Sequence, residues 1–268
     1  MSVSPNLPCL VVLVALLPAL AWAQDADESF RQGERFLAER QWEAAFTALQ
    51  RAVKLQPGHA RAWKALGLGY ASQGNFDGAE TSFRNACERE AALPDACLYY
   101  GRTLYLLNRF QPAIDSLRRT LQREPENSEA YRLLALSLEA QGQTTEAGDA
   151  FLRAVRLNIQ MNSGASPNED PDIDYAVFLF RQGNAEAALA PLESVLKRHP
   201  DAARAHLEMG CVLLSLGRIS EAASRLERSL ALNPQSPRAH LLLGKVYLRL
   251  GKPEAAETHL RQGSVTVR

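Results

Sequence analysis

The residues of this chain with the greatest capacity for chemistry are its four cysteines and five histidines. A zinc site needs cysteines and histidines a few residues apart, and a hydrolytic site needs a nucleophile beside a base. The sequence contains no Cys-x-x-Cys pair and no His-Glu-x-x-His, Gly-x-Ser-x-Gly, phosphate-loop or dinucleotide motif. We therefore expect no catalytic residue, no metal and no cofactor. His206 and His240 instead stand 34 residues apart, which is the period of most of the chain.

One 34-residue unit, from Ala203 to Ser236, shows the pattern of elements most clearly. Its first half has apolar residues at helical spacing and ends near Gly217. Its second half has the same spacing and ends at Pro234, which cannot continue a helix. The unit is therefore predicted to be a helix A, a glycine turn, a helix B and a proline stop.

Further copies of this unit can be aligned in phase along the chain. Their predicted starts are Ala26, Ala60, Pro94, Ser128, Glu169, Ala203 and Pro237. Position 20 of the unit is alanine in every copy, namely Ala45, Ala79, Ala113, Ala147, Ala188, Ala222 and Ala256. Position 8 is glycine or alanine throughout. Small residues at both positions predict that the two helices of each copy cross at close range.

The copies resemble the tetratricopeptide repeat (TPR). That family has an aromatic residue at position 4, Leu at 7, Gly at 8, Tyr at 11, Ala at 20, Phe at 24 and Ala at 27. The copy from Ala60 carries Trp63, Leu66, Gly67, Tyr70, Ala79, Phe83 and Ala86 at these positions. The resemblance implies an all-α fold, a right-handed TPR superhelix (α-solenoid) of seven helix-turn-helix repeats.

In the TPR family the A helices line a concave groove that holds a partner, and this implies a set of candidate binding residues. They are Arg61, Lys64, Tyr99, Arg102, Tyr105 and Arg132. Arginine makes charge-assisted hydrogen bonds and tyrosine supplies flat contact area, so the set suits an extended peptide with acidic and apolar side chains. The alternative is a merely solvated face, because acidic residues stand close by.

Two of the cysteines fall on neighbouring predicted helices. Cys87 is at a core position of one helix B, and Cys97 is near the start of the next helix A. An exported protein meets an oxidising compartment, so a Cys87–Cys97 disulfide is one expectation and a buried, unbonded Cys87 is the other. Cys211 would then be left over, as a groove-lining apolar group or as a reactive thiol.

The sequence predicts four segments. Residues 1–23 have the apolar run and the Ala21-Trp22-Ala23 site of a cleaved signal peptide, with an uncleaved anchor as the alternative. Residues 24–161 hold repeats one to four, with starts at 26, 60, 94 and 128. Residues 162–168 are an inserted loop. Residues 169–268 hold repeats five to seven, with starts at 169, 203 and 237.

The inserted loop has two interpretations. It is either a surface loop, which tolerates extra residues at little cost, or a hinge between a four-repeat and a three-repeat block. After it, Asp170 is predicted to cap the next helix and Pro171 to be its first residue.

The formal net charge of the chain is zero. Nucleic-acid binding and polybasic membrane attachment both need surplus Lys and Arg, so we expect neither. We expect a non-catalytic protein- or peptide-binding scaffold or assembly factor, exported to the periplasm or secreted and without a membrane span after signal cleavage. The alternatives are a self-associating structural protein and a non-catalytic subunit of an envelope enzyme complex.

The C-terminal end lacks a polar capping helix in the sequence. Helix B of the last copy is predicted from about Glu254 to Gln262, and six residues follow it. Either Val265 and Val267 fold back over the Leu260 side, or a second copy of the chain covers that face in a homodimer.

Overall fold

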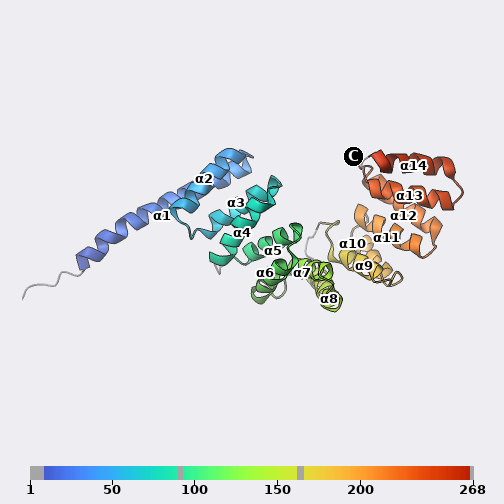
Figure 1. Ribbon diagram of the computed structural model, residues 1–268, viewed down its shortest axis with the longest axis horizontal. Helices are drawn as coiled ribbons and strands as arrows, with labels where there is room; N and C mark the ends of the chain where they lie inside the picture. Colours follow the sequence, from blue (N-terminus) through green and yellow to red (C-terminus); the bar gives the residue numbers. More distant parts are fainter. Residues whose placement is uncertain (1–8, 90–92, 162–165, 266–268) are drawn as a thin grey trace, which may run out of the picture. The chain divides into compact units, whose positions relative to one another are not determined.

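The computed structural model describes residues 9–89, 93–161 and 166–265, and these residues contain fourteen α-helices and no β-strand. Consecutive helices pack as antiparallel pairs, as predicted (Figure 1). The helices belong to two compact units, Met1–Pro125 and Glu126–Arg268. Each unit is described separately below.

The first unit contains the helices α1 to α6. They are α1 (Cys9–Ala38), α2 (Trp42–Leu55), α3 (Ala60–Ser72), α4 (Phe76–Arg89), α5 (Pro94–Leu106) and α6 (Phe110–Arg123). Helix α1 runs without a break through Ala23, where the sequence predicts a cleavage site, and residues 1–8 of the predicted signal lie outside the described residues. A search of the described helices finds none with the length and apolar character needed to cross a membrane.

The second unit contains the helices α7 to α14. They are α7 (Ser128–Ala140), α8 (Thr144–Met161), α9 (Pro171–Arg181), α10 (Leu189–Arg198), α11 (Ala203–Ser215), α12 (Ile219–Leu232), α13 (Pro237–Arg249) and α14 (Pro253–Val265). The compact units divide after Pro125, so the predicted insertion at residues 162–168 falls within the range of the second unit. Residues 162–165 of the insertion lie outside the described residues.

The predicted start of each helix A can be compared with the structure. Five begin at the predicted residue, namely α3, α5, α7, α11 and α13. Helix α9 begins at Pro171, two residues after the repeat start Glu169 and as its local sequence predicts, because the side chain of Asp170 accepts a hydrogen bond from the backbone N–H of Asp172 and caps the helix. Its partner α10 begins only at Leu189, so Ala188 precedes that helix instead of lying on it.

Close packing inside the pairs explains the small residues at positions 8 and 20. A Cβ atom added to Gly210 would lie 2.6 Å from Cγ of Leu226, and one added to Gly244 would lie 2.7 Å from Cγ of Leu260. Ala222 is fully buried at the same crossing. In these two copies the absence of a Cβ atom at position 8 lets the leucine at position 24 pack directly against the backbone of helix A.

The turn inside each pair has the same backbone conformation along the chain. Position 15 of every aligned copy has a positive φ, with values of 75° at Gly217, 58° at Arg40 and 57° at Asn108. Glycine occupies the other four such positions. Since a positive φ is strained for most residues, the glycine turn seen in the sequence has a direct backbone reason.

The C-terminal end differs from one expectation of the sequence. Helix α14 continues through Val265, so its last residues extend the helix and do not fold back over Leu260. Val267 lies outside the described residues. Glu257, Arg261 and Ser264 on α14 are exposed, whereas Ala256 and Gly263 are buried.

Candidate functional site

Two helices of the first unit carry most of the predicted binding residues. Arg61 and Lys64 lie on α3 at a spacing that places them on one side of the helix together with Leu68. Arg102 and Tyr105 lie on α5 at a similar spacing. We call this surface of α3 and α5 the candidate groove face.

An ion pair joins the two helices across this face. The Nζ atom of Lys64 lies 2.6 Å from Oδ2 of Asp95 at the start of α5. The other oxygen of Asp95, Oδ1, is buried and has no hydrogen-bond partner. The charge of Lys64 is therefore largely compensated inside the face, which makes it a weaker candidate for binding an acidic group than the sequence suggested.

The remaining cationic candidates of the first unit also have neighbours. The guanidinium of Arg61 lies 5.5 Å from the centre of the Phe30 ring, and its side chain is exposed. Arg102 is half-buried and interacts within the molecule.

The two tyrosines of the set pack against phenylalanine rings. The ring of Tyr99 stacks on Phe83 with the centroids 5.4 Å apart. The ring of Tyr105 lies 5.9 Å from that of Phe110 in a tilted arrangement. Both rings are held in fixed orientations and remain partly exposed.

Sequence reasoning missed two large apolar side chains on the groove face. Leu68 on α3 is 38% exposed and Leu106 on α5 is 50% exposed, whereas the other leucines of the unit whose burial is described are buried or partly buried. Leu68 shares its position with Arg102 one copy later, and Leu106 follows Tyr105 directly. The repeat positions of these two leucines therefore already indicated that they lie on the groove face. A large exposed leucine is informative when its repeat position belongs to a binding face.

Arg132 does not belong to this face. It lies on α7 in the second unit and is buried, with its Nη1 atom 2.6 Å from Oδ2 of Asp174 and its Nε atom 2.7 Å from Oε2 of Glu129. Although burial acts in the opposite direction, the hydrogen bonds and charges of Glu129 and Asp174 raise the pKa of Arg132. Its guanidinium nitrogens donate to Glu129 and Asp174 inside the protein, so Arg132 is a weaker candidate for a ligand contact than the exposed Arg61.

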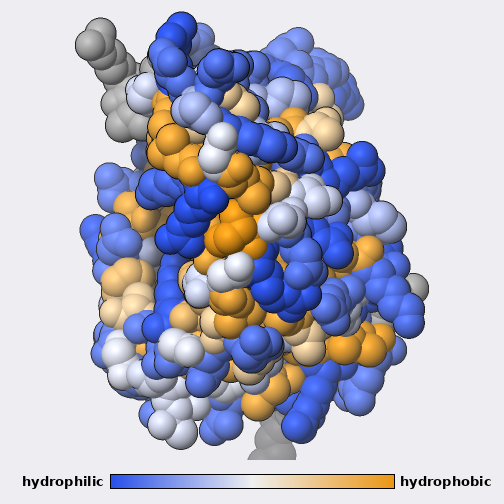
Figure 2. Space-filling view, turned by 90° about the vertical axis from the view of Figure 1, so that its right-hand side faces the viewer, coloured by the Kyte–Doolittle hydropathy of each residue, from blue (hydrophilic) through white to orange (hydrophobic). Residues whose placement is uncertain are grey.

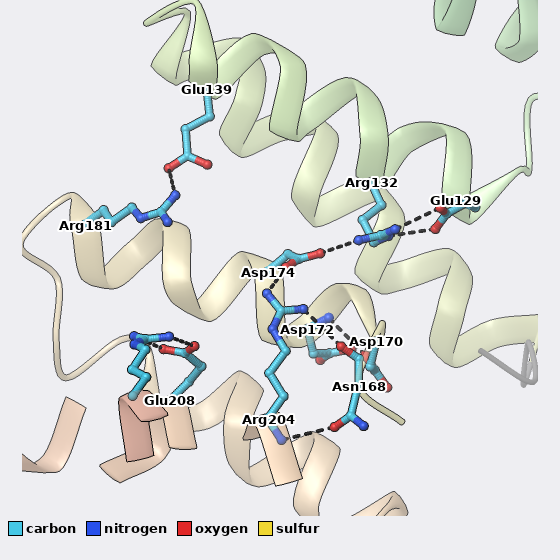
Figure 3. Close-up of polar contacts among 11 residues, drawn as sticks. Glu129, Arg132, Glu139, Asn168, Asp170, Asp172, Asp174, Arg181, Arg204 and Glu208 are labelled. Atoms are coloured by element: carbon cyan, nitrogen blue, oxygen red, sulfur yellow. Dashed lines mark hydrogen bonds and ion pairs between the residues drawn. The ribbon is translucent and has the colours of Figure 1, made fainter. Parts of the chain in front are cut away.

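Arg132 belongs to a polar cluster around the start of α9 (Figure 3). Asp174 lies between Arg132 and Arg204 and accepts hydrogen bonds from both. Asn168, from the insertion, accepts hydrogen bonds from the backbone N–H and the guanidinium of Arg204. The insertion thus supplies part of the contact between the fourth and later copies.

The structure joins Cys87 and Cys97 in a disulfide, with their sulfur atoms 2.08 Å apart and their Cα atoms 4.7 Å apart. Cys211 has no disulfide partner and is buried. Burial raises the pKa of the Cys211 thiol to about 11, even though Arg238 Nη2 lies 3.4 Å from the sulfur. Of the two expectations for Cys211, the structure favours the apolar group over the reactive thiol, because the thiolate is the reactive form.

The residue at position 4 has a recurring structural role. The ring nitrogen Nε2 of His206 lies 3.0 Å from the carbonyl oxygen of Pro200, and that of His240 lies 3.0 Å from the carbonyl of Pro234. The indole N–H of Trp63 donates to the carbonyl of Pro57 in the same way. Each ring therefore fastens helix A to the end of the preceding copy, which is the packing role expected for the two histidines. Among the described residues there is no group of three or more side chains suited to hold a metal.

Two family models match the sequence, and both carry the description tetratricopeptide repeat. The first matches residues 30–96, 99–162 and 207–263, and the second matches residues 179–228. Together these matches cover more than half of the chain.

Solved structures with the same fold include a tetratricopeptide repeat protein from Parabacteroides merdae. It is 16% identical, with a TM-score of 0.72 over 91% of this chain and 94% of that chain. Another is YrrB, described as a TPR protein with an unusual peptide-binding site, which is 19% identical with a TM-score of 0.51 over 69% of this chain and 92% of that chain. At these identities the likeness concerns the fold.

A curated relative is Protein IFIT1 homolog B of Homo sapiens. It is 27% identical over 157 residues, which are 55% of this chain and 31% of that protein. The chain thus spans about a third of the length of this curated relative.

Proposed function

The chain belongs to the tetratricopeptide repeat family, and from this we propose that it is a non-catalytic scaffold that binds a protein or an extended peptide. One solved structure that matches 91% of this chain and 94% of its own length is a tetratricopeptide repeat protein, and YrrB is described as having a peptide-binding site. Each repeat of such a scaffold adds surface to one continuous face, which suits a long, extended partner.

The groove face of the first unit is our proposed binding surface. The observation that carries the proposal is the exposure of Leu68 and Leu106 on the face that also holds Arg61 and Arg102. Exposed apolar side chains supply affinity when a partner covers them, and the arginines supply direction through charge-assisted bonds. The partner that fits is an extended peptide with apolar side chains and at least one acidic group.

Selection from a random-peptide phage library tests this surface. We expect the wild-type protein to enrich peptides that combine apolar and acidic residues, and Leu106→Glu to lose them because it places a charge on the contact. Leu152→Glu is the matched control, since Leu152 is 36% exposed on a helix B of the other unit. Enrichment that Leu106→Glu leaves unchanged, or no enrichment at all, would contradict the proposal.

We further propose that the protein acts in the cell envelope as an assembly factor. The apolar run and Ala21-Trp22-Ala23 support export, and the Cys87–Cys97 disulfide agrees with an oxidising compartment. In a reducing cytosol this disulfide would be an exception.

Self-association through the C-terminal pair is the second candidate, and a specific observation favours it. Leu248 on α13 is 54% exposed, whereas Leu214, at the same position one copy earlier, is partly buried. Seen from the side on which α13 and α14 lie in Figure 1, hydrophobic residues form a stripe between hydrophilic ones (Figure 2). A second copy of the chain that covers Leu248 would give a homodimer, although the polar outer side of α14 limits the contact to part of this end.

A further inference from the structure

Buried charges of both signs meet where the fourth and fifth copies join, within the second unit (Figure 3). The carboxylates are Glu129, Asp170, Asp172 and Asp174, and the guanidiniums are those of Arg132, Arg198 and Arg204. We call this group the junction cluster. If every carboxyl group were ionised, the four carboxylates and three guanidiniums would give the junction cluster a net charge of −1.

One half of the junction cluster is balanced. Asp174 accepts from Arg132 and from Arg204, and Glu129 accepts from two nitrogens of Arg132, at 2.7 and 2.8 Å. Two carboxylates thus face two guanidiniums. The donors of Arg132 and Arg204 that point into the cluster are already occupied.

The other half has two carboxyl groups and one guanidinium. Asp170 and Asp172 are 1% and 2% exposed, and Nη2 of Arg198 lies 2.9 Å from an oxygen of each. Asp170 also accepts from Nδ2 of Asn158, at 3.1 Å, and from the backbone N–H of Asp172, at 3.0 Å. The two carboxyl groups therefore converge on one guanidinium nitrogen at a site that is almost fully buried, where burial favours the protonated form of one of them.

We propose that Asp170 and Asp172 share one proton at the junction of the fourth and fifth copies, and that losing this proton loosens helix α9 from its neighbours. With the proton in place, the junction cluster is neutral. Without it, two buried negative charges face the single guanidinium of Arg198, and burying an uncompensated charge is costly. The packing of α9 against its neighbours should therefore depend on pH.

The surroundings supply no further positive charge to this pair. Helix α9 packs against α7, α8, α10 and α11. In the described contacts, the charged groups near the start of α9 are Glu129 and Arg132 from α7, Arg198 from α10 and Arg204 from α11. Helix α8 contributes the neutral amide of Asn158. On α11, Glu208 is engaged with Arg238 instead.

The pKa values of the pair agree with a shared proton. Burial, and then the hydrogen bond and charge of Asp170, raise the pKa of Asp172 to about 7. Burial acts against ionisation of Asp170 too, but the hydrogen bonds and charge of Arg198 and the hydrogen bonds of Asp172 together outweigh it and lower the pKa of that carboxyl. The two groups titrate as one unit, as close carboxyl pairs do.

The sign of the pH effect follows from linkage. Between the ordinary carboxyl pKa of about 4 and a pKa of about 7, the folded pair holds a proton that the unfolded chain has lost. The stabilisation by this proton is greatest at the acidic end of that range and is lost as the pH rises through about 7. The junction is thus tighter in mildly acidic than in neutral solution.

Amide hydrogen exchange of the full chain tests this pH dependence, after the measured rates are corrected for the intrinsic pH dependence of amide exchange. In the wild type, the opening equilibrium constant of α9 should rise by up to about tenfold per pH unit between about pH 5 and pH 7. In Asp172→Asn it should stay nearly constant, because asparagine fills the same space with a polar group that does not titrate. Asp201→Asn, which removes an exposed carboxyl of the same unit, should behave as the wild type. Equal pH dependence in the wild type and Asp172→Asn would overturn the proposal.

A second measurement needs no variant. Carbon-13 NMR of the aspartate carboxyl groups should show one signal of the wild-type protein that titrates near neutral pH. If every aspartate signal completes its titration below about pH 5, which ordinary carboxyl groups do, the pair holds no such proton and the proposal fails.

Discussion

At the scale of single residues, Arg132 shows what a repeat position leaves undetermined. The register assigned it correctly to helix A, but its partner Asp174 is 42 residues further along the chain and follows an insertion. Asp174 also accepts a hydrogen bond from Arg204, which stands at position 2 of its copy. A position in the repeat fixes the face of a helix but does not say which charged side chain the neighbouring copy will bring to it.

This difference between two arginines can be tested by charge reversal. Arg132→Glu should lower the free energy of unfolding by about 3–5 kcal/mol, because it leaves buried carboxylates without their counter-charge. Arg61→Glu should cost less than about 1 kcal/mol, because it removes an exposed cation above the Phe30 ring. Urea denaturation of the two variants measures both values. Similar losses would mean that Arg132 is not engaged as described.

At the scale of elements, much of the architecture could be predicted from the sequence. The period places helix starts, and α3, α5, α7, α11 and α13 begin at the predicted residues. The Asp170 cap and the start of α9 at Pro171 were also predicted, whereas α10 begins later than the repeat pattern indicates, at Leu189. Local sequence signals determine where such helices begin. The exposure of Leu68 and Leu106 and the ion pairs of the junction cluster depend instead on contacts between neighbouring copies, which a repeat position does not specify.

The close crossing within each pair gives a prediction at this scale. Ala222→Leu should lower the free energy of unfolding by about 1–3 kcal/mol, because the added atoms have no room where Leu226 passes over Gly210. Arg225→Leu adds an apolar side chain at an exposed site of the same helix and should change stability little. Chemical denaturation compares them, and equal losses would show that the assignment of the buried face of α12 is wrong.

At the scale of the whole molecule, export is the first open prediction. If the protein is exported and processed, intact-mass measurement of the envelope or secreted fraction should give a chain that begins at Gln24. The small residues Ala21 and Ala23 are what a signal peptidase accepts. A mass that includes Met1 would favour the uncleaved anchor.

Association of two molecules is the second prediction at this scale. Light scattering across a concentration series should show a dimer of the wild type that Leu248→Lys dissociates, because that substitution places a charge on the exposed part of α13. We prefer Leu248 to Leu260 for this test, since Leu260 packs against Gly244 and its replacement would disturb the fold. Leu152→Lys is the control. A wild-type protein that stays monomeric at high micromolar concentration would rule the dimer out.

The bonds between successive copies also make whole copies exchangeable. Excision of Ala203–Ser236 would bring His240 six residues after Pro200, the same separation that His206 has now. Arg238 would then occupy the position of Arg204 opposite Asp174. Unequal crossing-over between genes that removes this copy would therefore leave these donors and acceptors matched at the new boundary. The array can therefore lose such a copy over evolutionary time while the shortened chain still has matched contacts between its copies.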